Sequence, residues 1–286
     1  MQYFEHFGLS LDPFIKNAMQ GHQSYLSQDF DNASEILRAA AERNGVALIT
    51  AVPGLGKSHV IDRFLAGLDT SRHSGAYVCP PFVSVTEFYR MVAQSLGLDP
   101  TGNRQRLLSR IKTHIYGVYK RGRPIVLVVD EAQDLKFDVL AELHVFLNFD
   151  HDTTDAFTLI LTGGPGLNDL IETTEKLRAL KQRITNHYDF SGLSDAEIPF
   201  YLKHKLEFAG GSNLIIDDDA LRLLCPASCG ISRMIDHIMS DALAYGAQIG
   251  RNHIDAEIMQ VAIDNQSLTR RNRFSAKAAS LKSSAA

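Results

Sequence analysis

The chain has 286 residues, of which 45% are hydrophobic and 22% charged, and it carries a net charge of −4. These values are ordinary for globular proteins and exclude a collagen-like or wholly disordered chain. A chain of this length can bury one large core and one small one. No stretch approaches the roughly 18 consecutive apolar residues that a membrane helix needs. Since the first ten residues also lack a signal-peptide pattern, we predict a soluble, cytoplasmic protein with no membrane partner.

Three cysteines, Cys79, Cys225 and Cys229, lack metal-binding spacing. Their pattern is typical of small buried side chains in a reducing compartment. The tail at residues 269–286 has five basic residues and no acidic one, which leaves 24 basic against 33 acidic groups in the remainder. Its small and polar composition predicts disorder. Both a solvated chain end and an arm that contacts nucleic acid fit this charge pattern.

The elements predicted first in chain order are an irregular aromatic lead-in at residues 4–14 and a helix that ends at Gly45. Short apolar runs then alternate with helical patterns. Near-continuous apolar runs of this kind indicate parallel strands that are buried on both faces. The five runs are residues 46–50, 76–79, 125–129, 157–161 and 187–190.

After Gly192 the pattern changes to helices alone, at residues 195–208, 217–224, 232–245 and 255–263. The fold class predicted is therefore α/β, with a five-stranded parallel sheet followed by a small all-helical domain. The predicted organisation is a lead-in and first helix at 1–45, an α/β nucleotide-binding domain at 46–192, a helical lid domain at 193–268 and a basic tail at 269–286.

The loop at residues 51–58 lies between the first predicted strand and a helix, which is the context of a phosphate-binding loop. Glycines let successive backbone N–H groups point at a phosphate, and the helix N-terminus adds further donors. We expect Lys57 to bridge the β- and γ-phosphates of ATP and the Ser58 hydroxyl to bind Mg²⁺. Ala51 replaces the usual first glycine, a minor departure because alanine is small. The predicted nucleotide-binding residues are Pro53, Gly54, Leu55, Gly56, Lys57, Ser58 and His59.

Two carboxylates, Asp130 and Glu131, follow the apolar run at 125–129, at the strand end where open α/β sheets bind ligands. We expect Asp130 to hold Mg²⁺ through water and Glu131 to activate the attacking water as a general base. Thr162 ends the fourth run. It is either a hydrogen-bond partner of the attacking water or γ-phosphate, or a plain strand-end threonine.

The phosphate loop, the stretch Val-Val-Asp-Glu-Ala-Gln-Asp-Leu at 128–135 and the helical C-terminal part together resemble an AAA+ ATPase. Three further stretches are similar to the ExeA-like branch of that superfamily, and the whole resemblance covers residues 1 to about 265. Among ExeA-like chains, this one looks most like the transposon-encoded target-selection ATPases of the TniB/TnsC type. The three stretches are residues 7–14, 180–184 and 230–235.

The resemblance implies two functional arginines that composition does not reveal. Arg183 matches the arginine that one subunit offers to the γ-phosphate of its neighbour, with Arg178 as second choice. Arg233 matches the sensor arginine of the lid, which contacts nucleotide in its own subunit. The branch often has arginine where Lys181 stands and proline where Ser232 stands, so both positions depart from its pattern.

The resemblance also implies a homo-oligomer, either a ring or a helical filament, and several possible roles. Transposon-encoded relatives assemble with ATP on duplex DNA and recruit or regulate a transposase. ExeA-type relatives serve assembly of a secretion apparatus, and helicase loaders share the same core. A core with only a basic tail attached favours the first role, DNA transposition target selection.

Candidate DNA contacts lie between the second and third predicted strands. In AAA+ rings that track DNA, loops after the second strand face the central channel, so Thr101, Asn103, Arg104 and Arg106 are expected to contact phosphates without reading sequence. The same residues also fit a solvated helix start that Thr101 caps.

Overall fold

The computed structural model describes residues 2–16, 18–19, 23–80, 82–149, 153–211 and 215–266. The basic tail at 269–286 lies outside the described residues. The chain divides into two compact units, a sheet unit at Phe30–Phe190 and a helical unit that joins Met1–Asp29 to Ser191–Ala286. Among the described residues, no helix has both the length and the apolar character that crossing a bilayer requires.

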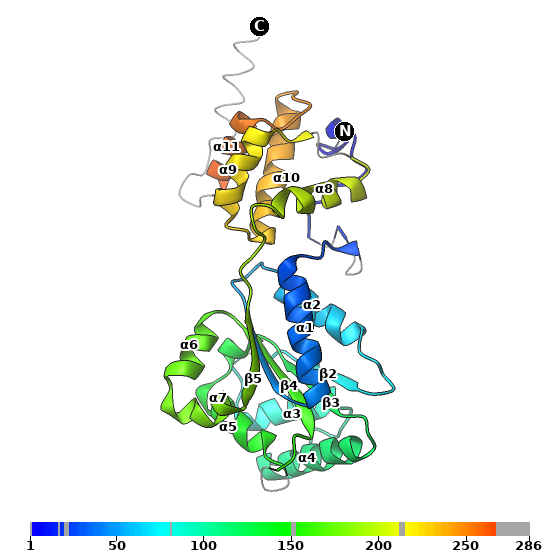
Figure 1. Cartoon of the computed structure of the whole chain (residues 1–286), viewed down its shortest axis with the longest axis vertical. Helices are drawn as coiled ribbons and strands as arrows, with labels where there is room; N and C mark the ends of the chain where they lie inside the picture. Colours follow the sequence, from blue (N-terminus) through cyan, green and yellow to red (C-terminus); the bar gives the residue numbers. More distant parts are fainter. Residues whose placement is uncertain are drawn as a thin grey trace. The chain divides into compact units, whose positions relative to one another are not determined.

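The sheet unit contains five parallel strands in the order β2-β3-β4-β1-β5 (Figure 1). This confirms the predicted α/β fold class. The edge strand β5 begins three residues before its predicted run. The prediction missed its first residues because the side chains of this strand alternate between half-buried and exposed positions and do not form an apolar run. The strands are β1 (Val46–Thr50), β2 (Ser74–Val78), β3 (Ile125–Val129), β4 (Phe157–Gly163) and β5 (Ile184–Asp189).

Helices cover both faces of this sheet. Side chains in a strand point alternately to opposite faces, and in β3 Ile125, Leu127 and Val129 pack on one side while Val126 and Val128 pack on the other. The Val126 side holds α1 (Gln28–Arg43) and α2 (Lys57–Ala66). The Ile125 side holds α3 (Val85–Ser95), α4 (Arg104–Lys120), α5 (Phe137–Leu147), α6 (Gly166–Thr173) and α7 (Arg178–Arg183).

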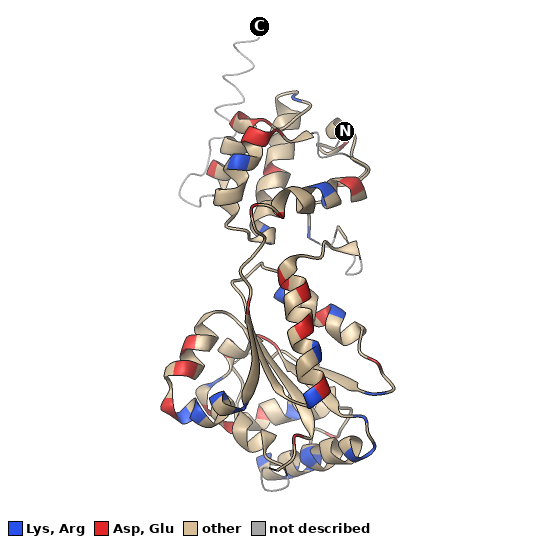
Figure 2. Ribbon diagram, in the orientation of Figure 1, with Lys and Arg blue, Asp and Glu red and all other residues tan. Residues whose placement is uncertain are grey.

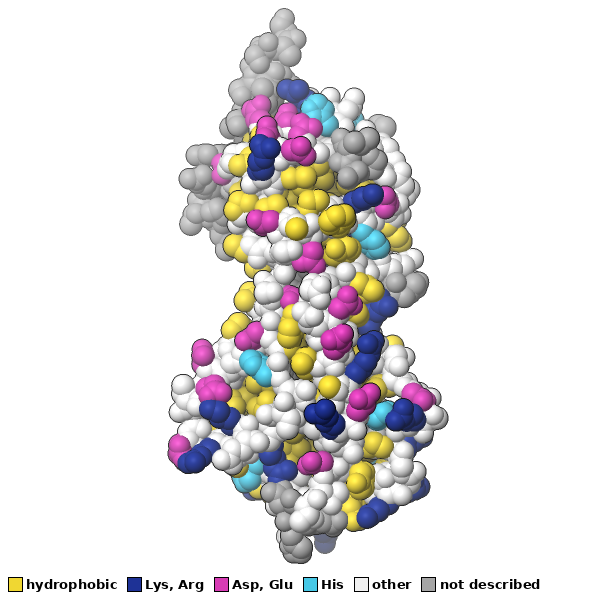
Figure 3. Space-filling view, in the orientation of Figure 1, with side chains coloured by type: hydrophobic (Ala, Val, Ile, Leu, Met, Phe, Trp, Pro, Cys, Tyr) yellow, Lys and Arg dark blue, Asp and Glu magenta, His cyan; other side chains and the backbone are white. Residues whose placement is uncertain are grey.

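The helical unit packs four helices around a core of its own. Within it, α9, α10 and α11 contact one another, and α8 precedes them in the chain. On the face shown in Figure 3, apolar side chains gather over this unit, whereas charged side chains of both signs are scattered over the sheet unit. The helices are α8 (Ile198–Phe208), α9 (Asp218–Ser228), α10 (Ser232–Gln248) and α11 (Ala256–Asn265).

The aromatic lead-in belongs to the helical unit, which differs from the predicted boundary at residue 45. Phe7, Leu9 and Phe14 are buried in the core of the helical unit. Two glycines make room for them: a Cβ at Gly211 would lie 2.2 Å from Leu9 Cδ2, and one at Gly246 would lie 3.0 Å from Phe7 Cζ. Helix α1, which we predicted to accompany the lead-in, packs on the sheet instead because its alanines and leucine fit that face.

Candidate active site

The loop at residues 51–56 joins β1 to α2 at the carboxyl edge of the sheet. Gly54 and Gly56 both adopt the left-handed conformation, with φ of 97° and 98°. Residues that have a Cβ rarely adopt this conformation. Gly56 is the N-cap of α2 and no side chain caps this helix, so its first N–H groups can donate to an anion. Ala51 is buried in the core between β1 and α2, and its small side chain is accommodated there.

Lys57, the first residue of α2, meets both predicted carboxylates. Its Nζ lies 3.2 Å from Asp130 Oδ1 and 3.1 Å from Glu131 Oε2. The side chains of Lys57 and Asp130 are almost fully buried, whereas the Glu131 side chain is 42% exposed. Lys57 and the adjacent pair Asp130 and Glu131, which are far from it in sequence, therefore form one compact charged cluster, because the loop after β1 and the end of β3 meet at the same sheet edge.

Besides its ion pair with Lys57, Asp130 accepts hydrogen bonds from three groups. Thr162 of β4 donates to its Oδ1, Tyr77 of β2 donates to its Oδ2 at 2.8 Å, and the Glu131 backbone N–H donates to Oδ1 at 2.9 Å. Burial opposes ionisation of this carboxyl, but the Thr162 bond, the Lys57 charge and the Tyr77 bond outweigh it, so the pKa of Asp130 lies below its ordinary value. Asp130 is therefore a fixed carboxylate near neutral pH.

Glu131 is positioned differently from Asp130. Its backbone is left-handed, with φ of 50° and ψ of 43°, at the start of the short helix η3 (Ala132–Asp134). The side-chain Nε2 of Gln133 donates to Glu131 Oε2 at 2.7 Å, and its side-chain Oε1 accepts the Gly164 N–H at 2.9 Å. Motif reasoning missed Tyr77 and Gln133. Both contact the site across neighbouring elements, and only the position of Gln133 two residues after Glu131 gave any signal.

His59 was predicted to contact nucleotide, but its side chain packs against helix α1. Its ring lies 5.7 Å from the Phe30 ring, centroid to centroid. Burial lowers the pKa of His59, with a further contribution from the Arg63 charge. Its Nε2 is buried and makes no hydrogen bond among the described residues. The contribution that His59 can make to a phosphate site is thus limited to its backbone.

Arg183 lies at the amino edge of the sheet, away from Lys57 of the same chain. It is the last residue of α7 and directly precedes β5, whose first residue Ile184 pairs with Val46 at the start of β1. Partial burial lowers the pKa of the Arg183 guanidinium. A five-residue strand spans about 16 Å, so this arginine cannot reach a phosphate that is held by its own loop.

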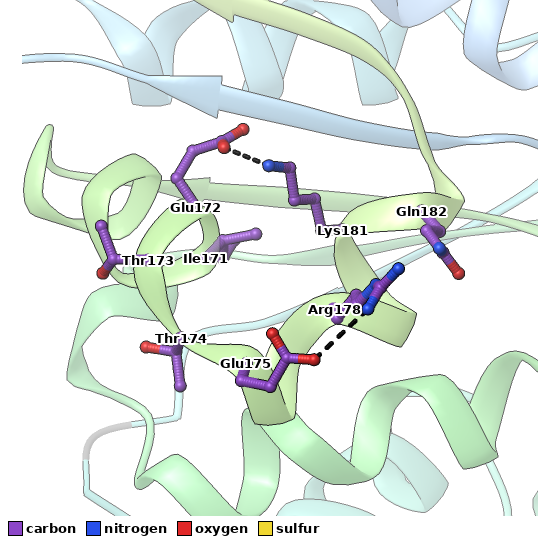
Figure 4. A pocket seen from close by; sticks show the side chains of 8 residues that line it. All are labelled: Ile171, Glu172, Thr173, Thr174, Glu175, Arg178, Lys181 and Gln182. Atoms are coloured by element: carbon purple, nitrogen blue, oxygen red, sulfur yellow. Dashed lines mark hydrogen bonds and ion pairs between the residues drawn. The ribbon is translucent and has the colours of Figure 1, made fainter.

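Two neighbouring basic residues, Arg178 and Lys181, line a pocket between α6 and α7 (Figure 4). Arg178 pairs with Glu175 of the short helix η5 (Glu175–Leu177) at 3.4 Å, and Lys181 pairs with Glu172. Both pairs are exposed, and exposed pairs contribute little. The pocket is separate from the phosphate loop and belongs to the segment that leads into Arg183.

Arg233 is the second residue of α10 in the helical unit, and its side chain is exposed. The turn before α10 depends on Gly230, which is left-handed with φ of 70°. A Cβ there would lie 2.4 Å from the Leu193 carbonyl oxygen, and the Leu193 N–H donates to the Gly230 carbonyl at 2.9 Å. Gly230 therefore fixes where α10 begins and hence where Arg233 emerges from the helical unit.

The predicted DNA contacts lie at the start of α4. Asn103, not Thr101, caps this helix: its side chain accepts the Arg106 N–H at 3.0 Å, while Thr101 donates to Asp99. The expectation that Thr101 caps the helix was therefore wrong, since Asp99 two residues earlier captures its hydroxyl. Arg104 pairs with Glu142 of α5 at 2.5 Å, and Arg106 is exposed.

The charged residues in and just after α4 are all basic. Residues 104–123 include seven basic residues and no acidic one, and Figure 2 shows basic positions along this helix. Five of them make contacts within the unit: Arg104 with Glu142, Arg110 with Asp99, Lys112 with backbone carbonyls at the end of α5, Lys120 with the Tyr116 ring, and Arg123 with the His73 carbonyl. Of the two predicted arginine contacts, Arg104 is in an ion pair, whereas Arg106 is exposed and forms no ion pair within the described part of the chain.

The chemistry of the carboxyl edge fits a nucleotide with Mg²⁺. A Cβ placed on Gly56 would meet nothing within 4 Å, so the loop leaves open space above the helix N-terminus. The first turn of α2 contains no acidic residue that would repel a phosphate. The Ser58 hydroxyl and the Asp130 carboxylate supply the oxygen ligands that Mg²⁺ prefers alongside phosphate and water.

Part of the chain that carries this geometry is similar to a known family of domains. A family model described as AAA domain matches residues 40–171, which include the loop, Asp130, Glu131 and Thr162. Residues 40–171 are therefore similar to an AAA domain. The sheet unit has the α/β fold of P-loop nucleotide-binding proteins, with its charged cluster at the edge where such folds bind phosphate.

Over 244 residues the chain is 30% identical to general secretion pathway protein A of Aeromonas hydrophila, a match that spans 84% of this chain. The chain covers 44% of the length of that relative. Structural similarity extends to Cdc6p of Pyrobaculum aerophilum, with a TM-score of 0.65 and 17% identity over 89% of this chain and 71% of that one. Drosophila ORC bound to DNA gives a TM-score of 0.64 and 15% identity, over 91% and 66%. At these identities the two structures show a shared fold.

Proposed function

We propose that this chain hydrolyses ATP at the carboxyl edge of its sheet, in sites that two copies of the chain complete together. The observation that carries the proposal is the cluster in which Lys57 Nζ lies within 3.2 Å of both Asp130 and Glu131. A cation at a glycine-rich helix N-terminus binds phosphate, and an adjacent carboxylate can remove a proton from water.

Each residue of the cluster has a distinct task in this proposal. The N–H groups of the loop hold the phosphates, and Lys57 exchanges its carboxylate partners for phosphate oxygens. Mg²⁺, when bound at Ser58 and Asp130, neutralises phosphate charge. Glu131 then accepts the proton of the attacking water, while Thr162 keeps Asp130 in place and can reach toward the γ-phosphate.

The second copy supplies Arg183. This arginine lies at the amino edge, where it cannot serve the phosphate loop of its own chain, and we propose that it neutralises transition-state charge in the neighbouring site. We further propose that Arg233 contacts nucleotide bound by its own chain and couples the helical unit to hydrolysis.

The proposed role of the oligomer is DNA transposition target selection: it assembles with ATP on duplex DNA and recruits or regulates a transposase. The positive charge of residues 104–123, which include no acidic residue, supports contact with phosphates, and Arg106 is exposed at the start of α4. Arg104, Thr101 and Asn103 lie beside it, although each already makes a contact within the unit.

A second candidate role is service to a secretion apparatus. The 30% identity to general secretion pathway protein A over most of this chain favours it. The proposed hydrolysis chemistry is the same in both roles, and only the partner of the oligomer differs.

Hydrolysis is tested by comparing ATP turnover of the wild-type chain and Glu131→Gln. We expect the variant to bind ATP normally and to lose about 10²–10⁴-fold in turnover, because only the proton acceptor changes. Turnover equal to that of wild type would show that Glu131 is not the proton acceptor and would leave a nucleotide switch that does not hydrolyse ATP as the alternative.

The two roles are separated by electron microscopy of the chain with duplex DNA and a slowly hydrolysed ATP analogue at low salt. Rings or filaments on DNA, lost as salt rises, support the transposition role. A chain that ignores duplex DNA under these conditions contradicts that role and leaves the secretion role, which predicts association with secretion components.

A further inference from the structure

The backbone at Glu131 turns its side chain away from the path of the strand. Glu131 is one of four non-glycine residues with positive φ in the described part of the chain. Its N–H donates to Asp130 Oδ1 at 2.9 Å, and its carbonyl accepts the Asp134 N–H at 2.9 Å. Such conformations are uncommon for residues with a side chain and persist where neighbouring contacts impose them. The backbone thus fixes where the carboxylate starts but leaves its side-chain torsions open.

The Gln133 side chain restricts those remaining torsions. Its Nε2 donates to Glu131 Oε2 at 2.7 Å, and its Oε1 accepts the Gly164 N–H at 2.9 Å. A backbone N–H can only donate and a carboxylate only accepts, so the orientation of the amide follows from chemistry. One glutamine side chain therefore ties the carboxylate at the end of β3 to the backbone that follows β4.

Gly163 provides the space for this bridge. A Cβ at Gly163 would lie 2.6 Å from Gln133 Oε1 and 2.8 Å from Leu167 Cδ2. Its φ is not positive, so the glycine is needed for space rather than for conformation. The adjacent Gly164 differs, because a Cβ there would meet nothing within 4 Å. The end of β4 is therefore shaped around the Gln133 amide.

Both cationic and amide donors reach the same oxygen of Glu131. Lys57 Nζ and Gln133 Nε2 lie 3.1 Å and 2.7 Å from Oε2, and the described contacts include none to Oε1, on a side chain that is 42% exposed. When Lys57 turns to phosphate, Gln133 remains as the donor that anchors Oε2. Oε1 is then directed outward as the acceptor for a water proton.

We infer that Gln133 is a positioning residue that holds the Glu131 carboxylate in its proton-accepting orientation once Lys57 has moved to the nucleotide. This inference rests on the proposed function. Because Gly164 leads into α6, η5 and α7, which ends at Arg183, the same bridge couples Glu131 to the segment that we propose contacts the neighbouring copy. Gln133 thereby makes the orientation of the base depend on the state of that segment.

The main test replaces Gln133 with Met, which keeps the length of the side chain but removes both hydrogen bonds. We expect kcat to fall by about 10²-fold, as for a misplaced catalytic group, while the Kd of a fluorescent ATP analogue stays unchanged. Thermal unfolding of each variant shows that it is folded. A Gln133→Met chain that folds and keeps the wild-type kcat overturns the inference.

Gly163→Ala is an independent variant, since it displaces the Gln133 amide without altering it. We expect the same loss in kcat with nucleotide affinity retained. Gly166→Ala is the matched control: it lies outside the bridge and adds its methyl group in open space, so its kcat should equal that of wild type. Equal kcat for Gly163→Ala and Gly166→Ala would count against the inference.

A double variant separates positioning from general structural damage. In the Glu131→Gln background, adding Gln133→Met should lower turnover no further, because residues that act as a unit are non-additive. A further drop of similar size would show that Gln133 acts elsewhere and would overturn the inference. If Glu131→Gln alone retains full turnover, the proposed hydrolysis by Glu131 fails first, and the two failures are thus distinguishable.

Discussion

The carboxyl and amino edges of the sheet differ in the charged residues that they carry. At the carboxyl edge, Lys57, Asp130 and Glu131 compensate one another within 3.2 Å, and Thr162 and Tyr77 complete the shell of Asp130. At the amino edge, basic residues lie shortly before four strands: Arg43 before β1, Arg72 and His73 before β2, Arg121 and Arg123 before β3, and Arg183 before β5. Asp155, before β4, is an acidic residue at that edge.

The two edges therefore differ in how well they fit a single bound nucleotide. At the carboxyl edge, phosphate would accept hydrogen bonds from Lys57 and the loop, and Mg²⁺ would be coordinated by Ser58 and Asp130. The cations of the amino edge lie about 16 Å away along the strands, too far to contribute to the same site. We propose that a neighbouring copy uses Arg183 and that a polyanion contacts the basic residues along α4.

The largest expected effect comes from Arg183→Ala, which tests the amino edge. An arginine supplied in trans is worth about 10³–10⁵ in rate, so turnover of the assembled oligomer should fall by that order while ATP binding is retained. Arg178→Ala is the matched control, because its exposed pair with Glu175 contributes little. Steady-state turnover and ATP-analogue binding measure both variants.

Mixing decides whether Arg183 acts between copies. Arg183→Ala chains keep a complete carboxyl edge, and Glu131→Gln chains keep the arginine. Mixed oligomers should therefore regain turnover that neither variant has alone. Mixtures that stay inactive although the two variants co-assemble would break the comparison, because they would place Arg183 in a structural role.

Lys57→Met tests the carboxyl edge. Loss of charged hydrogen bonds to phosphate should weaken ATP binding about 10- to 100-fold. Without nucleotide, the variant should also unfold more easily than wild type, since the buried Asp130 loses its cation. Adding Asp130→Asn should recover part of that stability, and calorimetry without nucleotide measures it. A double variant less stable than Lys57→Met would contradict the proposed charge compensation.

Thr162→Val sharpens the description of Asp130 through its pH dependence. The pKa of Asp130 is depressed in the folded chain, so its contribution to stability is present above the unfolded value of about 3.9 and is lost as pH falls through the folded value. Removing the Thr162 bond should cost about 1 kcal/mol at pH 7. The difference from wild type should disappear in acid, which urea unfolding at several pH values can follow. A pH-independent difference would point to packing instead.

The smallest effects separate Arg104 from Arg106. Arg104→Ala should cost less than about 1 kcal/mol of stability, because its pair with Glu142 is more than half exposed on the arginine side. Arg106→Ala should leave stability unchanged and reduce the salt slope of DNA binding by about one. Fluorescence anisotropy over a salt series measures the slope. An unchanged slope for Arg106→Ala removes α4 from the proposed DNA surface.

Contiguous motifs made much of the site predictable. Lys57, Asp130 and Glu131 sit at strand ends that parallel topology must bring to one edge, so their meeting followed from order alone. The role of Tyr77 could not be predicted, because it depends on β2 pairing with β3. No single stretch of sequence reveals which strands are neighbours in a sheet. Thr101 was predicted as a DNA contact, with a helix cap as the alternative. The cap alternative was wrong because Asp99 accepts the Thr101 hydroxyl and Asn103, two residues later, caps the helix instead. The fold of the lead-in was equally hidden, since its partners come two hundred residues later.

That lead-in sets an order of events during synthesis. Phe7, Leu9 and Phe14 leave the ribosome first, yet the glycines that receive them, Gly211 and Gly246, are made only after the whole sheet unit. At about 5–20 residues per second, these aromatic and aliphatic side chains wait tens of seconds for their core. The sheet unit, whose contacts all lie within one continuous segment, can fold in that interval. The nascent chain can therefore carry a folded sheet unit while the apolar side chains of the lead-in are still exposed, a state in which chaperone binding is expected.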